Sequence, residues 1–166
     1  EGADIDILLL KGALGKGGRR ANRLSGGAQK KALHAQAMVL ASPVYFGDCS
    51  SWQTAFLETV PLSGKVVGAV SVGAKRNGGQ ETNNIFTLMT AMSRGGVVVG
   101  NGPPTSQYGG TGWAGDVGAI LDDNFGLATS LGTGKRVFEV ARQLQVEGGS
   151  TARILVQIGR ASCRER

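Results

Sequence analysis

The sequence predicts an α/β protein in which helices cover both faces of a parallel β-sheet. Short apolar runs, of the length of buried strands, alternate along the chain with segments whose apolar residues recur at helical spacing. The run KVVGAVSVG, residues 65–73, is continuous rather than alternating, which is typical of a strand that is buried on both faces. Strands that alternate with helices favour right-handed crossovers and a three-layer architecture, and 166 residues suit one such domain.

Four elements are predicted in the first half of the chain. They are a strand over Asp4–Leu10, a helix over Ala28–Gln36, a strand over Ala37–Ser42 and a helix over Ser50–Thr59. Both strands are apolar runs, and the first helix has the helix-favouring composition AQKKALHAQ. In the second helix Trp52 and Phe56 lie at helical spacing, and Pro61 ends it. The Gly- and Arg-rich segment 11–27 predicts a loop.

Four further elements are predicted in the second half. They are a strand over Lys65–Gly73, a helix over Gln80–Ser93, a strand over Gly95–Gly100 and a helix over Asp123–Val146. Both strands are again apolar runs, KVVGAVSVG and GGVVVG. The first of these helices carries Ile85, Leu88, Met89 and Met92 on one face, and the second also has apolar residues at helical spacing. A long Gly/Pro loop is predicted over Asn101–Gly118.

Composition and charge limit the possible partners. No apolar run reaches the roughly 18 residues of a membrane span, and Cys49 and Cys163 have no spacing typical of a metal site or disulfide. Much of the +6 net charge comes from seven cations between Lys11 and Lys31 with no acid among them. Such a run is usually a solvated loop, and no aromatic residues interleave with it as nucleic-acid binding would favour. We expect no nucleic-acid partner and no metal.

The two ends of the chain lead to separate expectations. The chain starts with Glu rather than Met and has no signal-peptide pattern, so we expect a fragment of a cytoplasmic protein. The segment IGRASCRER follows a strand-like pattern, has no hydrophobic period of its own and resembles the translation of a sequencing adaptor. We expect residues 1–157 to form one partial domain and residues 158–166 to be a non-native tail.

Glycine-rich motifs follow three of the predicted strands. The 28 glycines are more than twice the usual share of about 7%, and many lie in SPVYFG, VGAKRNGG and GNGPPTSQYGGTGWAG. Glycine lets the backbone approach a ligand closely, and ligands of open parallel sheets bind outside the carboxyl ends of the strands. We therefore expect these loops to meet at one edge of the sheet and to form a site there.

The motifs SPVYFGDCSSWQTAFLE, GGQET and YGGTGWAG, in this order and at this spacing, resemble the flavodoxin-like NAD(P)H-dependent FMN reductases. The resemblance is greatest to the quinone reductases once named tryptophan-repressor-binding proteins, and it covers roughly residues 28–144. It implies a flavodoxin-like three-layer α/β/α fold and an FMN cofactor. It also implies that NADH or NADPH donates electrons and that a quinone or similar acceptor receives them. The alternative is a non-catalytic electron carrier of the flavodoxin type.

The resemblance implies that two loops hold the flavin ring. Their residues are Pro43, Val44, Tyr45, Phe46, Gly47, Val72, Gly73, Ala74, Lys75, Arg76, Asn77 and Gly78. Relatives carry Ser, Thr and Gly where this chain has GAKRN, so hydroxyl contacts are lost. Lys75 or Arg76 either stabilises a reduced, anionic flavin or is a solvated cation. No catalytic side chain is expected, because the flavin carries the chemistry, and Asp122 with Asp123 predicts a helix cap.

Three further residues are implied to contact a substrate or a second subunit. Arg94 stands where close relatives carry a histidine that reaches the flavin of a neighbouring subunit. Tyr108 and Trp113, in the long loop, are candidates for covering the flavin ring or a quinone. The resemblance thus implies a homo-oligomer, either a dimer or a tetramer.

The front of the chain departs from the family pattern. Only 32 residues separate Leu10 from Pro43, too few for two strand–helix units. Residues 1–10 therefore best match the second, edge strand, which leaves the first, central strand and its phosphate loop absent. The alternative takes residues 1–10 as the first strand and KGALGKGGRRANR, residues 11–23, as a substitute phosphate loop.

Overall fold

The structure, a computed structural model, describes residues 4–10, 26–145 and 153–158. Its centre is a six-stranded sheet in which every paired strand is parallel and the order is β1-β6-β2-β3-β4, with β5 also paired to β3. The strands are β1 (Asp4–Leu9), β2 (Ala37–Pro43), β3 (Val66–Gly73), β4 (Val97–Val98), β5 (Gly110–Trp113) and β6 (Arg153–Ile158). The predicted parallel sheet is confirmed.

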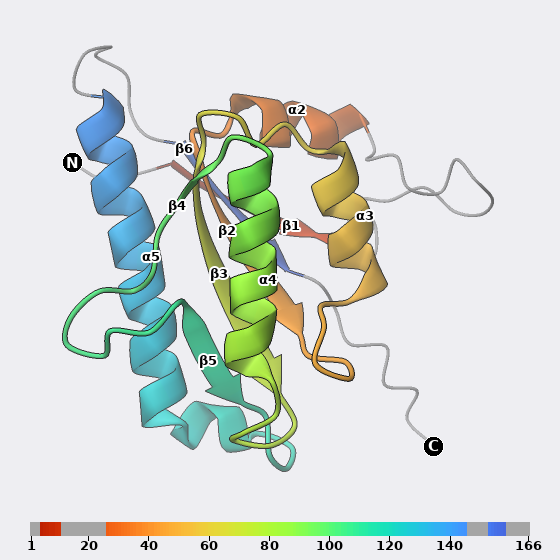
Figure 1. Ribbon diagram of the computed structural model, residues 1–166, viewed down its shortest axis with the longest axis vertical. Helices are drawn as coiled ribbons and strands as arrows, with labels where there is room; N and C mark the ends of the chain where they lie inside the picture. The colour runs from red at the N-terminus through yellow and green to blue at the C-terminus, as the bar shows by residue number, and fades with distance from the viewer. Residues whose placement is uncertain (1–3, 11–25, 146–152, 159–166) are drawn as a thin grey trace.

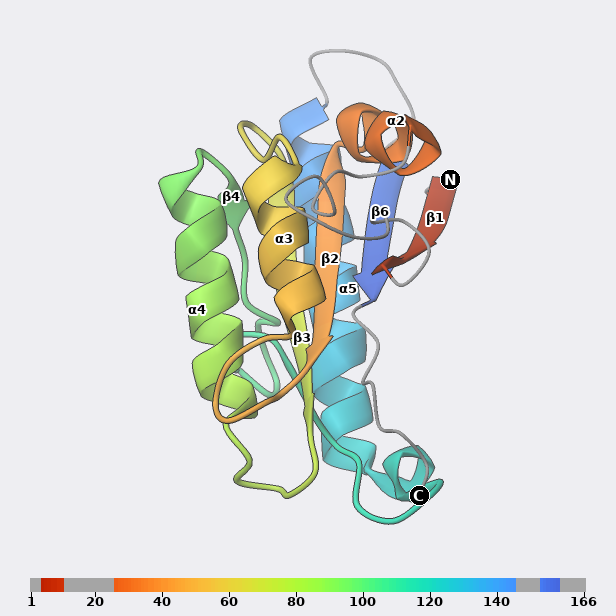
Figure 2. The same ribbon diagram turned by 90° about the vertical axis from the view of Figure 1, so that its right-hand side faces the viewer.

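Helices cover both faces of the sheet and make three layers (Figures 1 and 2). The helices are α2 (Gly26–His34), α3 (Ser51–Thr59), α4 (Gln80–Ser93) and α5 (Asn124–Gln145), with a short 3₁₀ helix, η1 (Ala119–Asp122), before α5. On one face, α2, α3 and α4 pack around Phe56, Met38 and Leu40. On the other face, α5 packs its Val137 against Val66. None of the helices described is long and apolar enough to cross a membrane.

The interior position next to the edge strand is filled by β6, which follows α5. It lies between β1 and β2 and is parallel to both, with Ile154 and Leu155 buried. From the sequence we expected the sheet to lack its first, central strand. The apolar run RILVQI supplies a strand at that position instead. β1 occupies the edge, which favours assigning residues 1–10 to the second strand. Of the predicted tail, Ile158 ends β6, and the rest lies outside the described residues.

The fourth strand differs from the prediction over Gly95–Gly100. Only Val97–Val98 forms β4, and the chain returns to β3 as β5, inside the segment predicted to be a loop. Glycines suggested a loop, but here they allow close packing. A Cβ on Gly112 would lie 3.2 Å from the Val72 side chain on the neighbouring strand and 3.0 Å from Ile120.

Two predicted apolar faces are less buried than expected. β1 was predicted to be buried, but Ile5, Ile7 and Leu9 are exposed on this strand at the edge of the sheet. On α4, Leu88 packs into the core whereas Met89 and Met92 are exposed. The sheet-facing side of α4 is largely polar and includes the buried residues Asn83, Asn84 and Thr87.

Candidate functional site

Three loops meet at the edge formed by the carboxyl ends of β2, β3 and β5 (Figures 1 and 2). They are loop 43–47, loop 73–79 and the segment 113–118. The first two touch, because a Cβ on Gly79 would lie 3.2 Å from the Cα of Gly47. The second and third are joined by a hydrogen bond of 3.1 Å from Trp113 Nε1 to the Ala74 oxygen. The prediction that these glycine-rich loops, which contain Phe46, Asn77 and Trp113, meet at one edge of the sheet is thus confirmed.

Loop 43–47 ends in a tight turn that presents Phe46. Tyr45 and Asp48 exchange backbone hydrogen bonds of 2.8 and 3.0 Å across the turn. Phe46 and Gly47 both have positive φ, 52° and 87°, the pattern of a type I′ turn. A left-handed backbone is costly for a bulky residue, by about 1–2 kcal/mol. The Phe46 side chain is nevertheless fully exposed, at 109%. An aromatic ring held in this way, at a cost and without burial, is typical of a binding surface.

Loop 73–79 is held in place by Gln80, the first residue of α4. The side chain of Gln80 is 3% exposed. Its Nε2 donates to the main-chain oxygens of Lys75 (2.7 Å) and Gly112 (3.1 Å), and its Oε1 accepts from the Gly78 amide (2.8 Å). One side chain therefore closes the loop on itself and ties it to β5. No local sequence pattern indicates this role of Gln80.

A carboxylate clamp, made by Asp123 and Arg76, joins the same loop to α5. Asp123 Oδ1 pairs with the Arg76 guanidinium and accepts from the Gly126 amide at 2.9 Å, while Oδ2 accepts from the Trp113 amide at 2.7 Å. Burial raises the pKa of Asp123, but these hydrogen bonds and the Arg76 charge outweigh it, so the net pKa lies below its usual value. The bond to Gly126 confirms the predicted cap. Arg76 is a partner of Asp123 rather than a solvated cation.

A cavity of about 420 Å³ opens at this edge. Arg76, Asn77 and Gly79 line it from loop 73–79, with Gln107, Thr111 and Phe125 among the other lining residues. Its size lies within the usual range of about 300–1,000 Å³ for small-molecule sites. Loop 43–47 does not line this cavity, so the two predicted flavin loops share an edge but not this hollow.

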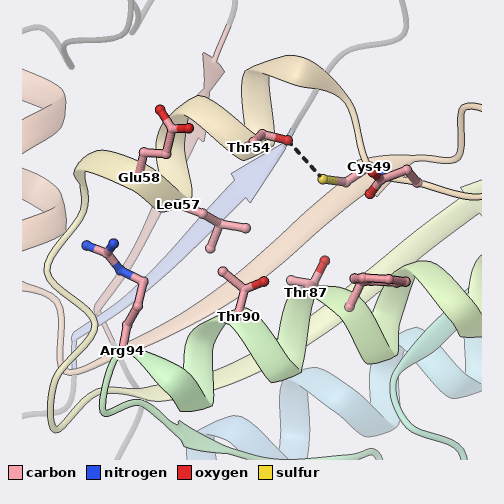
Figure 3. A pocket seen from close by; sticks show the side chains of 9 residues that line it. Cys49, Thr54, Leu57, Glu58, Thr87, Thr90 and Arg94 are labelled. Atoms are coloured by element: carbon pink, nitrogen blue, oxygen red, sulfur yellow. Dashed lines mark hydrogen bonds between the residues drawn. The ribbon is translucent and has the colours of Figure 1, made fainter.

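A second, smaller groove of about 220 Å³ runs between α3 and α4. Figure 3 shows Arg94 and Glu58 at one end and Cys49 at the other. Cys49 Sγ lies 3.4 Å from Thr54 Oγ1. Burial raises the pKa of the Cys49 thiol, and the hydrogen bond with Thr54 offsets this only in part. The groove is smaller than usual sites for molecules of flavin size, and its thiol is protonated at neutral pH.

Two predicted contact residues lie away from the three loops of their own chain. Arg94 follows the last residue of α4, whose 14 residues span about 20 Å, and it donates to the Val60 oxygen at 3.2 Å. Tyr108 precedes β5, whose residues Gly110 to Trp113 alone cover about 10 Å. Only Trp113 joins the edge. The substitute phosphate loop considered over residues 11–23 lies outside the described residues.

Comparisons with known proteins agree with this fold. A family model described as NADPH-dependent FMN reductase matches residues 26–108, half of the chain. An iron–sulfur flavoprotein from Methanocaldococcus jannaschii is 39% identical over 127 residues, which are 70% of this chain and 64% of that protein. An iron–sulfur flavoprotein from Methanosarcina thermophila is 31% identical over 120 residues, 67% of this chain and 59% of that protein. The chain thus spans less than two thirds of the length of these relatives.

A solved structure shows the same architecture. The flavodoxin, WrbA-like protein from Agrobacterium tumefaciens superposes with a TM-score of 0.56, at 24% identity, over 74% of this chain and 76% of that one. At this identity the likeness concerns the fold alone, which is flavodoxin-like. The family model over half of the chain and the relative at 39% identity confirm the resemblance noted in the sequence: the chain belongs to the NADPH-dependent FMN reductase family.

Proposed function

We propose that this chain forms the flavin-ring side of an FMN-dependent oxidoreductase that takes electrons from NADH or NADPH and passes them to a quinone or similar acceptor. The observation that carries the proposal is the meeting of loop 43–47 and loop 73–79 at one edge of the sheet, with the Phe46 ring fully exposed there. Family membership supports it. A cytoplasmic location would fit such a reaction.

The residues at the edge fit a planar, partly apolar ring. Phe46 and Trp113 offer apolar faces, and main-chain groups of loop 43–47 and loop 73–79 offer hydrogen bonds to its polar rim. The left-handed residues Gly47 and Gly79 let the backbones come close. When bound, FMN would supply the two-electron chemistry, so the chain's own task is to bind, orient and partly cover the ring.

FMN binding to the wild type and to Phe46→Asn tests the proposal. Asn favours a left-handed backbone, so the turn is kept while the ring is lost. We expect quenching of flavin fluorescence to show binding by the wild type, weakened about tenfold in the variant by loss of an aromatic contact. Equal affinity would contradict the assigned role of Phe46, and no binding by either protein would contradict the function.

Turnover separates the reductase from a flavodoxin-type electron carrier. With FMN bound, a reductase oxidises NADH or NADPH when a soluble quinone is the only acceptor. An electron carrier shows negligible turnover under the same conditions, because it needs a separate reductase. The second outcome would replace the proposed activity while keeping the cofactor.

The iron–sulfur cluster named for two relatives is not carried over to these residues. Such clusters are usually held by four cysteine thiolates, or by two cysteines and two histidines in Rieske centres. The 166 residues contain two cysteines and one histidine. Within the part of the chain that the structure describes, no three His, Cys, Asp or Glu residues gather as metal ligands.

We further propose that the chain forms a homo-oligomer through the outer face of α4. Phe86, Met89 and Met92 are 58%, 56% and 57% exposed on this face, and the sequence has no charged residue between Glu81 and Arg94. A solvated helix face normally carries charges, whereas interface cores are depleted of them and enriched in Met and aromatic residues. In this proposal Arg94, which follows the last residue of α4, contacts the second subunit.

A further inference from the structure

The carboxylate clamp connects three parts of the edge through one side chain. Asp123 is only 4% exposed, yet its two oxygens bind loop 73–79 through Arg76, β5 through the Trp113 amide, and the start of α5 through the Gly126 amide. Each of these partners is an N–H donor, and hydrogen bonds from N–H donors to an ionised carboxylate are stronger than those between neutral groups. Because a buried carboxylate without its cation would be costly, the Arg76 pairing is held firmly.

The clamp also fixes the ring of Trp113 from several sides. The Trp113 amide binds Asp123, its indole Nε1 donates to the Ala74 oxygen at 3.1 Å, and the Arg76 guanidinium lies 5.8 Å from the ring centroid. This guanidinium distance is within the range of a cation–π contact. Trp113 is 38% exposed, so part of the residue remains accessible at the edge.

We infer that Asp123 is a positioning residue for the flavin site. Its negative charge, acting through Arg76, sets where loop 73–79 and the Trp113 ring lie before any ligand binds. A ligand that had to order these groups itself would lose affinity, because immobilising loops and side chains costs free energy. This inference rests on the proposed function. It adds to the proposed flavin site a residue, Asp123, that acts through Arg76 and Trp113.

The Asp123→Asn variant separates this role from helix capping. Asn is as good an N-cap as Asp, so the bond from the Gly126 amide can be kept. The amide nitrogen of Asn cannot accept a hydrogen bond from the Trp113 amide, and the neutral side chain forms no ion pair with Arg76, although its Oδ1 still accepts a hydrogen bond. Asp122→Asn is the matched control, because Asp122 is adjacent, exposed and outside the clamp.

Two measurements on the full chain test the inference. The first is the NMR signal and hydrogen exchange of the Trp113 indole N–H without FMN, assigned with Trp113→Phe. The second is FMN affinity by fluorescence quenching. We expect Asp123→Asn to move the indole signal, speed its exchange and weaken FMN binding about tenfold, the effect of one charge-assisted hydrogen bond. Asp122→Asn should change neither.

The FMN affinity of the double variant Arg76→Gln/Asp123→Asn distinguishes the positioning role from a general contribution to folding stability. Arg76→Gln alone leaves the buried Asp123 charge unpaired, so it should be the most damaging single change. Adding Asp123→Asn to it removes that charge, and we expect the pair to bind FMN at least as well as Arg76→Gln alone. Additive losses would overturn the inference.

The outcomes also separate the inference from the proposed function. An unchanged FMN affinity in Asp123→Asn, with or without a moved indole signal, overturns the positioning role and leaves the proposed function standing. Absence of FMN binding by the wild type overturns the proposed function and the positioning role with it.

Discussion

The turn at Phe46 gives a stability prediction that runs opposite to its effect on binding. Phe46 has φ of 52° and is fully exposed, so it has left-handed strain without burial to offset it. Asn tolerates this backbone, and Asn-Gly is the preferred pair for a type I′ turn. We expect Phe46→Asn to raise the free energy of unfolding by about 1 kcal/mol.

Chemical denaturation without FMN measures this change, and for a domain of this length it corresponds to about 2–4 °C in Tm. Phe46→Ala is the control, because Ala also has a Cβ and keeps the left-handed strain. We expect Phe46→Ala to gain little. If the Asn variant is less stable than the wild type, or if Ala stabilises as much as Asn, then backbone strain at Phe46 does not lower the free energy of unfolding.

Three other predictions follow from packing and charge. Gly109→Ala would place a Cβ against a main-chain oxygen of β3 and should lower the free energy of unfolding by about 1–3 kcal/mol, whereas Gly134→Ala, on an open helix position, should raise it by up to about 1 kcal/mol; urea unfolding compares the two. The folded pKa of Asp123 lies below its unfolded value, so its contribution to stability is complete above about pH 4 and is lost as the pH falls through the folded pKa; Asp123→Asn should flatten this acid loss in unfolding curves taken from pH 5 to pH 2, and an unchanged slope would contradict the cited interactions. Met89→Lys should reduce the mass measured by light scattering, whereas Leu131→Lys, at an even more exposed position on α5, should not; a monomeric wild type would refute the α4 interface.

The order of strands and helices could be predicted from local patterns. The predicted bounds of α4, Gln80–Ser93, are the observed ones, because a segment with apolar residues at helical spacing lies there between Gly79 and Gly95. The place of β6 could not be predicted in this way. A strand's neighbours depend on contacts between segments more than 100 residues apart, such as Ile5 with Ile154, and local periodicity carries no information about them.

The candidate site was predictable in its position but not in its internal contacts. Strand direction alone brings loop 43–47 and loop 73–79 to one edge, because carboxyl ends of parallel strands share it. The pairing of Arg76 with Asp123 spans 47 residues, and neither residue has a local pattern that identifies the other. The glycines of β5 were misleading: their pattern indicated a loop, since glycine is rare in strands, and only the close packing of β3, η1 and α5 around them explains their presence in a strand.

The interrupted strand beside β3 allows an insertion in the chain between its two pieces. β4 and β5 each pair with β3 independently, so the position of Trp113 is set by its own ladder partner, Gly73, and not by the length of the excursion that precedes it. Gly102, in that excursion, has no neighbouring atom within 4 Å of where a Cβ would be. An affinity tag or a fluorescent peptide grafted there would report on the molecule while leaving the ligand-facing edge in its native shape.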